Sequence, residues 1–201
     1  MMFESQKSQN QKENTMSPNE ATLVKLYASI NAKDLEGIFA CYHDDATNQG
    51  ASNAGKNAST HFHDIAFHLN GKSHICDMWR MICSKNKRGT KSDLHVEVTR
   101  LLIDGETGTA EVVFTYHMRN ENRKKSPIGR RVRNPTRSAF TFQDGKIVRQ
   151  IDTANAALWG SKAFGGLPGL IVGHVGLVRR WLAMRKLRKF AGQSVARHSV
   201  P

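Results

Sequence analysis

Apolar residues recur at helical spacing in three stretches of the N-terminal half of the chain. Each stretch has apolar side chains at positions i, i+3, i+4 and i+7, the pattern of a helix that buries one face. These positions are Leu23, Leu26, Tyr27 and Ile30, then Leu35, Ile38, Phe39 and Tyr42, then Ile75, Met78, Trp79 and Ile82. Ser17, Pro18 and Glu20 form a capping box before the first stretch, and Asp34 precedes the second as an N-cap. The pattern predicts three helices.

After Lys91 the apolar period changes to two, which indicates β-strands. Four segments alternate in this way: residues 93–104, 109–118, 137–143 and 146–153. Tight turns are marked by DGETG between the first two segments and by QDGK between the last two. Helices followed by a run of antiparallel strands predict an α+β fold, in which helices cover one face of a sheet.

The pattern becomes helical again from Ala156, is interrupted by GGLPGLIVGHVG at residues 165–176, and then resumes. On a helical wheel of the last segment, one half carries Leu177, Trp181, Met184, Leu187 and Phe190. The other half carries Arg179, Arg185, Lys186 and Lys189, while Arg180 and Arg188 intrude on the apolar half. The first residues are polar and lack any apolar periodicity. We therefore predict a disordered tail at residues 1–16, one domain at 17–165 and a basic helical extension at 166–201.

Composition is that of one globular domain with tails: the chain has 201 residues, 39% of them hydrophobic and 23% charged. No apolar run is long enough to span a membrane, and the polar N-terminus lacks the apolar segment of a secretory signal. Cys41, Cys76 and Cys83 form no CxxC pair, which predicts reduced thiols in a cytoplasmic protein.

The net charge of +13 comes from two segments of the chain. Residues 119–133 hold seven basic residues and one acid, and residues 179–201 hold seven basic residues and no acid, so the rest is neutral. Such segments are either solvated or favour an anionic surface. The basic amphipathic segment Arg179–Lys189 suits an anionic membrane surface, unless it packs on the domain or on a second copy. Nucleic acid is disfavoured as a partner because no stacking platform or RNA motif accompanies the charge.

Asp64 lies in the sequence FHDIAF, where a carboxylate is costly to bury unless it is paired, protonated or used in chemistry. A metal site with His61, His63 and His68 would need further ligands from fixed elements, and no downstream Cys/His pair supplies them. The sequence also contains no phosphate-binding loop, dinucleotide-binding glycine motif or serine-nucleophile elbow. We therefore predict neither a metal nor a cofactor.

Polar residues also interrupt apolar faces in a way that a concave site between sheet and helices requires. Tyr27 lies on the buried face of the first helix, where its hydroxyl needs a partner or a ligand. Ser138 shares a strand face with Phe140, and Asp152 shares one with Gln150. The alternatives are a core tyrosine with a satisfied hydroxyl, and outward-facing positions for Ser138 and Asp152.

A resemblance to the ketosteroid isomerases, and to the wider nuclear transport factor 2-like or SnoaL-like superfamily, covers about residues 19–190. It is carried by VKLYASINAKDLEGIFACYHDDAT, FHDIAFHLNGKSHICDMWRMI and FQDGKIVRQIDTANAALWGSKAFG, while GLPGLIVGHVGLVRRW is similar to a bacterial branch of the superfamily. The resemblance implies a cone, in which a strongly curved antiparallel sheet surrounds a hydrophobic cavity that three N-terminal helices close. Such domains are often homodimers. The motifs are specific for the fold rather than for one activity.

The resemblance also implies roles for individual residues. In the isomerases an aspartate after the second helix moves a proton beside a ketone, and a tyrosine polarises the carbonyl; these roles fall on Asp64 and Tyr27. Ser138 stands where the isomerases have a carboxylic acid, so half of that oxyanion hole is altered. The segment GASNAGKNAS is extra in this chain and lies in the same loop region as Asp64.

In limonene epoxide hydrolases an aspartate on the last strand activates water, and Asp152 matches it. Their arginine and second aspartate have no counterpart in VVFTYHM, so this activity is disfavoured.

The sequence thus predicts acid–base chemistry of the isomerase or cyclase type on a small hydrophobic carbonyl compound, with Asp64 as base and Tyr27 as donor. The expected substrate-binding residues are Trp79, Ser138, Phe140 and Asp152. The alternative is a module that binds a hydrophobic ligand without converting it, which the missing acid at Ser138 favours, associated with a membrane surface through the basic segment.

Overall fold

The structure is a computed structural model that describes residues 16–44, 59–84, 92–118 and 129–198. The predicted disordered tail, except its last residue, and most of the basic segment at residues 119–133 lie outside these ranges. The helices are α1 (Pro18–Ala32), α2 (Leu35–Ala40), α3 (Lys72–Cys83), α4 (Ala156–Phe164), α5 (Gly166–His174) and α6 (Gly176–His198). The strands are β1 (His61–His63), β2 (His68–Asn70), β3 (His95–Asp104), β4 (Thr107–His117), β5 (Arg131–Gln143) and β6 (Lys146–Ala154).

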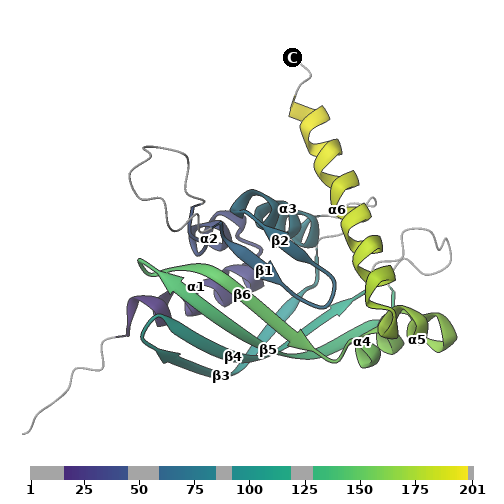
Figure 1. The fold of residues 1–201 in the computed structure, drawn as a ribbon, viewed down its shortest axis with the longest axis horizontal. Helices are drawn as coiled ribbons and strands as arrows, with labels where there is room; N and C mark the ends of the chain where they lie inside the picture. Colours follow the sequence, from purple (N-terminus) through teal and green to yellow (C-terminus); the bar gives the residue numbers. More distant parts are fainter. Residues whose placement is uncertain (1–15, 45–58, 85–91, 119–128, 199–201) are drawn as a thin grey trace, which may run out of the picture.

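One six-stranded sheet in the order β2-β1-β6-β5-β4-β3 forms the centre of the fold (Figure 1). Neighbouring strands are antiparallel except β1 and β6, which run parallel. The sheet curves without closing, and α1, α2 and α3 pack against it and against one another. The predicted α+β class, with a curved sheet and three N-terminal helices, is confirmed.

Helix α1 begins and ends through specific contacts that fix it against the sheet. Ser17 Oγ accepts a hydrogen bond from the Glu20 backbone N–H at 3.2 Å, as the capping box predicts. Near the other end, the Asn31 side-chain amide donates to the Val96 carbonyl at 2.9 Å and accepts from the Val96 N–H at 2.7 Å. Because β3 is an edge strand, these bonds satisfy backbone groups that no further strand pairs. The buried face of α1 is thereby held in register with the sheet.

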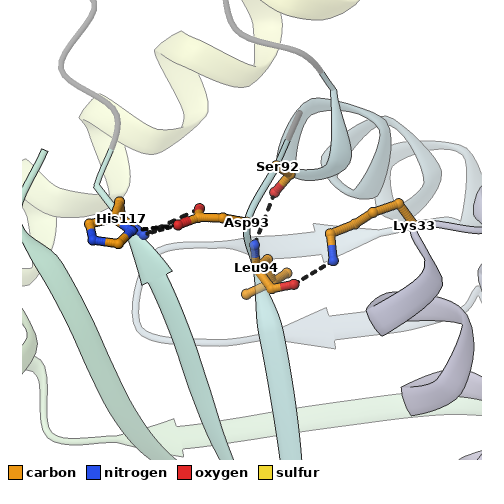
Figure 2. Close-up of polar contacts among 5 residues, drawn as sticks. All are labelled: Lys33, Ser92, Asp93, Leu94 and His117. Carbon is orange, nitrogen blue, oxygen red and sulfur yellow. Dashed lines mark hydrogen bonds and ion pairs between the residues drawn. The ribbon is translucent and has the colours of Figure 1, made fainter. Parts of the chain in front are cut away.

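Lys33 ends α1 in a left-handed conformation, with φ 60°, and its ammonium group donates to the Ile30 carbonyl at 3.0 Å and to the Leu94 carbonyl (Figure 2). Beside it, the Asp93 carboxylate accepts from the His117 backbone N–H at 3.1 Å and contacts His117 Nδ1 at 2.5 Å (Figure 2). These contacts join the end of α1, the start of β3 and the end of β4. The layer of helices and the outer hairpin are therefore connected by polar contacts as well as by the apolar core.

Two stretches that the sequence analysis treated as loops are strands. The histidine-rich segment around Asp64 forms β1 and β2, in which only the middle residues Phe62 and Leu69 are buried. Strands of three residues are too short to show an alternating pattern in sequence. Strand β5 starts at Arg131, within the basic segment at residues 119–133, which lies between two of the predicted strands. Pro135 in this strand is paired with Val113 on β4, and pairing with β6 begins only at the next residue.

The predicted interruption at residues 165–176 is wrong for most of its length, since it contains helix α5. Glycines make this helix pack very closely against α4. A Cβ atom on Gly160 would lie 2.4 Å from the Gly169 carbonyl oxygen, and one on Gly173 would lie 2.8 Å from Ala157 Cα. The glycines, which in the sequence indicated a break in the helix, therefore allow α4 and α5 to contact each other along their backbones.

The predicted apolar half of the last helix is also wrong in part. Leu187 is buried in the core, but Leu177 and Trp181 are 79% and 60% exposed. Arg179, which the helical wheel placed on the solvated half, is only 9% exposed. Leu187 and Arg179 therefore lie on the inner side of α6, which faces α3 and α5. The C-terminal half of α6 projects beyond the rest of the chain (Figure 1).

Candidate functional site

A row of buried polar side chains crosses the inner face of the sheet. Ser138 on β5 lies directly opposite Asp152 on β6, and Phe140 lies directly opposite Gln150. Ser138, Phe140 and Gln150 are nearly inaccessible, whereas Asp152 remains partly accessible. Tyr27 is buried on the face of α1 that packs on this side of the sheet. Ser138 and Asp152 thus face inward in the structure, and the outward-facing alternative is wrong.

A chain of hydrogen bonds leads from the helices to the Asp152 carboxyl group. Trp79 Nε1 donates to the Tyr42 hydroxyl at 3.2 Å, and that hydroxyl donates to Gln150 Oε1 at 2.7 Å. Gln150 Nε2 then donates to both Asp152 oxygens, at 3.0 and 3.1 Å. Because every donor in this chain is occupied, the orientations of Gln150 and Asp152 are fixed by the fold.

Two hydroxyl groups beside these hydrogen bonds, those of Tyr27 and Ser138, have no hydrogen-bond partner among the residues that the structure describes. The Ser138 hydroxyl lies close to Tyr27 and to the Asp152 carboxyl group, but forms no hydrogen bond of good geometry with either. An unpaired buried hydroxyl costs about 1–3 kcal/mol. Two such groups next to one carboxyl group are what a site for a polar ligand atom requires.

Asp64 lies in the turn between β1 and β2 and organises that turn. Its Oδ1 accepts hydrogen bonds from the backbone N–H groups of Ala66, at 2.6 Å, and of Phe67. Its own N–H donates to the Phe67 carbonyl at 2.9 Å. One carboxylate oxygen therefore has a structural role, which the sequence analysis did not assign to it.

Arg179 connects helix α6 to this turn. Its Nε donates to the Ile65 carbonyl, while its Nη1 donates to the Val172 and Gly173 carbonyls at 3.2 and 2.8 Å. The last two carbonyls belong to the final turn of α5, where a cation is favoured by the helix dipole. The guanidinium thus holds α5, α6 and the residue after Asp64 together.

The pKa values of the two aspartates are raised well above their usual range. Burial raises the pKa of Asp64 to about 6, although the N–H groups of Phe67 and Ala66 and the charge of Arg179 act in the opposite direction. Burial also raises the pKa of Asp152 to about 7; hydrogen bonding to Gln150 opposes this rise, and the charge of Asp64 adds to it. Both carboxyl groups therefore exchange their protons closer to neutral pH than an exposed aspartate does, in the range where many enzymes work.

Two tyrosines lie near the two aspartates, Tyr27 near Asp152 and Tyr116 near Asp64, and their hydroxyls stay protonated. Burial, and then the charge of Asp152, raise the pKa of Tyr27 above its usual range. Burial raises the pKa of Tyr116 to about 12, with the indole N–H of Trp159 donating to its hydroxyl at 2.7 Å and Asp64 near enough to raise the value. A tyrosine that keeps its proton can donate a hydrogen bond but cannot act as a base.

The structure brings together Tyr27, Ser138, Phe140 and Asp152, and it places Asp64 close enough to influence the charge of Asp152. Trp79 contacts this group only through Tyr42. Sequence reasoning missed the roles of Tyr42 and Gln150. Tyr42 had been assigned to the apolar face of the second helix, and Gln150 was noted only as a neighbour of Asp152.

A groove of about 340 Å³ lies elsewhere, between α1 and β3, and Tyr27 is the only predicted site residue that lines it. Its other lining residues are Val24, Ala28, Asn31, Val96, Val98 and Leu101. This groove lies on the outer edge of the sheet rather than at the polar row. In the described ranges no three histidine, cysteine or carboxylate side chains come together in a way that could hold a metal ion. His63 and His68 do face each other on β1 and β2, with ring centroids 3.3 Å apart.

Comparison with known proteins locates the fold. Residues 23–150 match the family model described as a SnoaL-like domain. No curated protein matches the sequence significantly.

Several solved structures share the fold at low sequence identity. An LEH-like epoxide hydrolase from M. tuberculosis is 16% identical, with a TM-score of 0.50, over 80% of this chain and 95% of its own. A candidate polyketide cyclase from Pseudomonas putida is 17% identical, with a TM-score of 0.50, over 74% and 99% of the two chains. A protein of ketosteroid isomerase-like fold from Catenulispora acidiphila, in complex with trimethylamine, is 15% identical, with a TM-score of 0.50, over 74% and 94%. At such identities the likeness establishes the fold, and the chemistry must be argued from the residues.

Proposed function

The chain belongs to the SnoaL-like family, and from this premise we propose that its inner polar row binds a small hydrophobic carbonyl compound and performs acid–base chemistry of the isomerase or cyclase type on it. The observation that carries the proposal is the pair of buried, unpartnered hydroxyls of Tyr27 and Ser138 beside the Asp152 carboxyl group. Groups that the fold leaves unsatisfied at a cost are suited to a ligand that satisfies them.

The raised pKa values of the two carboxyl groups suggest how the roles are divided. Asp64 suits the carboxylate role, because two backbone N–H groups and the charge of Arg179 favour its ionised form, while the charge of Asp64 favours the protonated form of Asp152. Asp64 then accepts a proton from the carbon beside the substrate carbonyl, and the electron pair of that C–H bond moves to form the enolate. The Tyr27 hydroxyl and protonated Asp152 donate hydrogen bonds to the enolate oxygen, and Asp64 returns the proton to another carbon.

In this scheme Asp152 takes over the function of the acid that Ser138 replaces. Ser138 and Asp152 lie directly opposite each other on β5 and β6, so a protonated Asp152 is available on the strand next to the altered position. A single such donor contributes on the order of a hundredfold in rate. The substitution at Ser138 therefore leaves an acidic donor available at a shifted position.

A second candidate function is ligand binding without conversion. It is favoured by the engagement of Asp64 Oδ1 with the N–H groups of Ala66 and Phe67, which orients this carboxylate for the turn. In this case the hydroxyls of Tyr27 and Ser138 would bind the polar end of a hydrophobic molecule, and Asp64 would only shape the site.

The first experiment is a thermal-shift screen of the full chain against cyclic ketones, steroids, lactones and epoxides. A ligand that binds only the folded state raises the melting temperature by mass action. Each ketone that does so is then incubated with the protein in heavy water, and exchange of its α-protons for deuterium is followed by NMR. Enolisation at the site gives this exchange when Asp64 trades its proton with the solvent, and a rearranged isomer in the same spectra when Asp64 returns the proton to another carbon.

The decisive variants are Asp64→Asn and Asp152→Asn, with Asp104→Asn at the exposed end of β3 as the matched control. We expect the first two to slow exchange by about a hundredfold or more and the control to leave it unchanged. Binding that persists in Asp64→Asn, with neither exchange nor isomerisation in wild type or any variant, would establish the ligand-binding function instead. Conversion of an epoxide to a diol would replace both proposals.

A further inference from the structure

The outward side of the C-terminal helices exposes many large apolar side chains. Eight of the twelve exposed large hydrophobic residues that the structure describes lie between residues 158 and 182. We call them the C-terminal face: Leu158, Phe164, Ile171, Val175, Leu177, Val178, Trp181 and Leu182. Soluble domains seldom gather exposed apolar residues in this way unless the surface binds something.

The exposed side of α6 has an ordered distribution of residue types. Its first two turns present Leu177, Val178, Trp181 and Leu182, at positions i, i+1, i+4 and i+5, and all four are exposed. The next turns of the same side present exposed basic residues, which are Arg185, Arg188 and Lys189. The Arg185 guanidinium lies 5.3 Å from the centre of the Trp181 ring, at the boundary of the two zones. Along this side of α6, an apolar zone formed by Leu177, Val178, Trp181 and Leu182 is therefore followed by a cationic zone formed by Arg185, Arg188 and Lys189.

The charge of this part of the chain has a single sign. Residues 153–201 contain eight lysine and arginine residues and no aspartate or glutamate. No ion pair joins the exposed cations of α6 to another residue within the described ranges. The cationic zone is thus not neutralised by its own helix or by the parts of the domain that the structure describes.

Helix α6 is also held firmly enough to present this side. Leu187 belongs to the core, and Arg179 donates to the carbonyls of Ile65, Val172 and Gly173. Both residues lie on the inner side of the helix. The exposed apolar side chains are therefore presented by an anchored element, and are not the exposed side of a loose tail.

We propose that the C-terminal face and the neighbouring cationic zone of α6 together bind an anionic membrane surface. The apolar side chains of the face enter the acyl boundary, and the cations contact the lipid headgroups. Hydrocarbon next to negative charge is the environment that an apolar zone followed by a cationic zone complements. No described helix is long and apolar enough to cross a membrane. In the proposed binding mode α6 lies along the lipid surface.

Other partners fit these observations less well. A second copy of the chain would bring the same cations against each other, and no acid after Asp152 could neutralise them. A nucleic acid would neutralise the cations, but offers no hydrocarbon for Leu177, Val178 and Leu182. The charge and the aliphatic residues together therefore favour an anionic lipid surface.

The test is co-sedimentation of the full chain with vesicles of phosphatidylglycerol and phosphatidylcholine, compared with vesicles of phosphatidylcholine alone. We expect binding to the anionic vesicles that weakens as salt is added. Trp181 provides a second signal, because its emission shifts to the blue on entering lipid; of the other two tryptophans, Trp79 is already buried and Trp159 is only partly accessible. The variant Trp181→Phe should keep binding and lose this shift.

Paired variants separate the contribution of the apolar zone to vesicle binding from that of the cationic zone. Leu177→Ser with Trp181→Ser should weaken binding at least tenfold, whereas Val98→Ser with Leu102→Ser, exposed on β3, should not. Changing Arg185, Arg188 and Lys189 to glutamine should weaken binding on the order of a hundredfold, at about fivefold for each cation. The matched control changes the exposed sheet residues Arg100, Arg131 and Arg137 to glutamine. Circular dichroism and melting temperature confirm that each variant is folded.

Three outcomes would overturn the proposal. The first is absence of vesicle binding by the folded wild-type chain. The second is equal loss of binding in the face variants and their controls, which would indicate a general charge effect. The third is self-association or nucleic-acid binding that depends on Leu177 and Trp181 while vesicles have no effect.

Discussion

The inner polar row and the C-terminal face depart from the usual distribution of residues in opposite directions. At the row, Asp152, Gln150, Tyr27 and Ser138 place polar groups where apolar ones are normally buried. At the face, eight large apolar residues are exposed where polar ones are normally found. A buried polar group and an exposed apolar patch are the two informative exceptions to hydrophobic burial. From the difference between them we propose a different class of ligand for each region: a small polar-ended molecule inside, and an extended anionic surface with an apolar interior outside.

Arg179 and Arg180 show the same contrast within two adjacent residues. The Arg179 side chain is buried and donates to three backbone carbonyls, while Arg180 is exposed. Arg179 belongs to the structure around Asp64, and Arg180 belongs to the surface charge. The predictions below test how separate these two roles are.

The largest effect is expected for Arg179→Ala. The change leaves the carbonyls of Ile65, Val172 and Gly173 without their donor and opens a gap between α5 and α6, which should cost about 3 kcal/mol of unfolding free energy. Arg180→Ala, at the next residue, should change the unfolding free energy by less than about 0.5 kcal/mol. Urea denaturation measures both. Equal effects would mean that the buried contacts of Arg179 do not stabilise the fold.

The next effect concerns the dependence of stability on pH. The pKa of Asp152 rises from an ordinary value of 3.8 to about 7 on folding, so the folded chain binds the extra proton between these values. The stability contributed by that proton is fully present below pH 3.8 and is lost as the pH rises through about 7. Wild type should therefore lose on the order of 2 kcal/mol between pH 5 and pH 8, and Asp152→Asn should lose clearly less.

Asp152→Asn is measured against Asp104→Asn, whose carboxyl group is at the exposed end of β3. Denaturation at several pH values gives the slope of unfolding free energy against pH for each protein. Parallel slopes for wild type and Asp152→Asn would show that Asp152 titrates normally, and the assignment of Asp152 as the proton donor would then be wrong.

A smaller effect is expected from removing single hydroxyls in the row. Tyr42→Phe leaves Gln150 Oε1 and the Trp79 indole N–H without their partner and should cost about 1–2 kcal/mol. Tyr27→Phe removes a hydroxyl that has no partner, so it should leave stability unchanged or raise it by up to about 1 kcal/mol. Thermal and urea denaturation compare the two. A larger loss in Tyr27→Phe would show that its hydroxyl is already satisfied in the free protein.

Apolar spacing in the sequence predicted the elements that carry the site better than it predicted the site itself. The caps at Ser17 and Asp34 and the buried quartet that includes Tyr27 follow from local rules, and the structure has them. The hydrogen bonds from Tyr42 to Gln150 and from there to Asp152 join residues 108 positions apart and have no local signature. Only the position of Gln150 on the same strand face as Asp152 gave a signal for them.

The C-terminal helices show where a helical wheel fails. The wheel grouped Leu177 and Trp181 with Leu187 because it assumes that the apolar half faces the protein. In the structure the inner side is defined by Leu187 and Arg179, since the carbonyls at the end of α5 and at Ile65 provide acceptors for a buried guanidinium. Sequence periodicity cannot show which acceptors a neighbouring element supplies. The predicted homodimer stays a prediction, as does the boundary between the domain and its basic extension.

The smallest expected effect distinguishes an exposed apolar face from one that supports the fold. Leu177→Ser removes a side chain that is 79% exposed, so in the absence of vesicles it should change the unfolding free energy by less than about 0.5 kcal/mol. Leu102→Ser on β3, where the side chain is 50% exposed, is the matched control and should behave alike. Urea denaturation at several protein concentrations is the measurement. A loss above about 1 kcal/mol that grows with protein concentration would mean that Leu177 is covered by another copy of the chain, and the contrast between an inner site and a free outer face would then fail at the outer face.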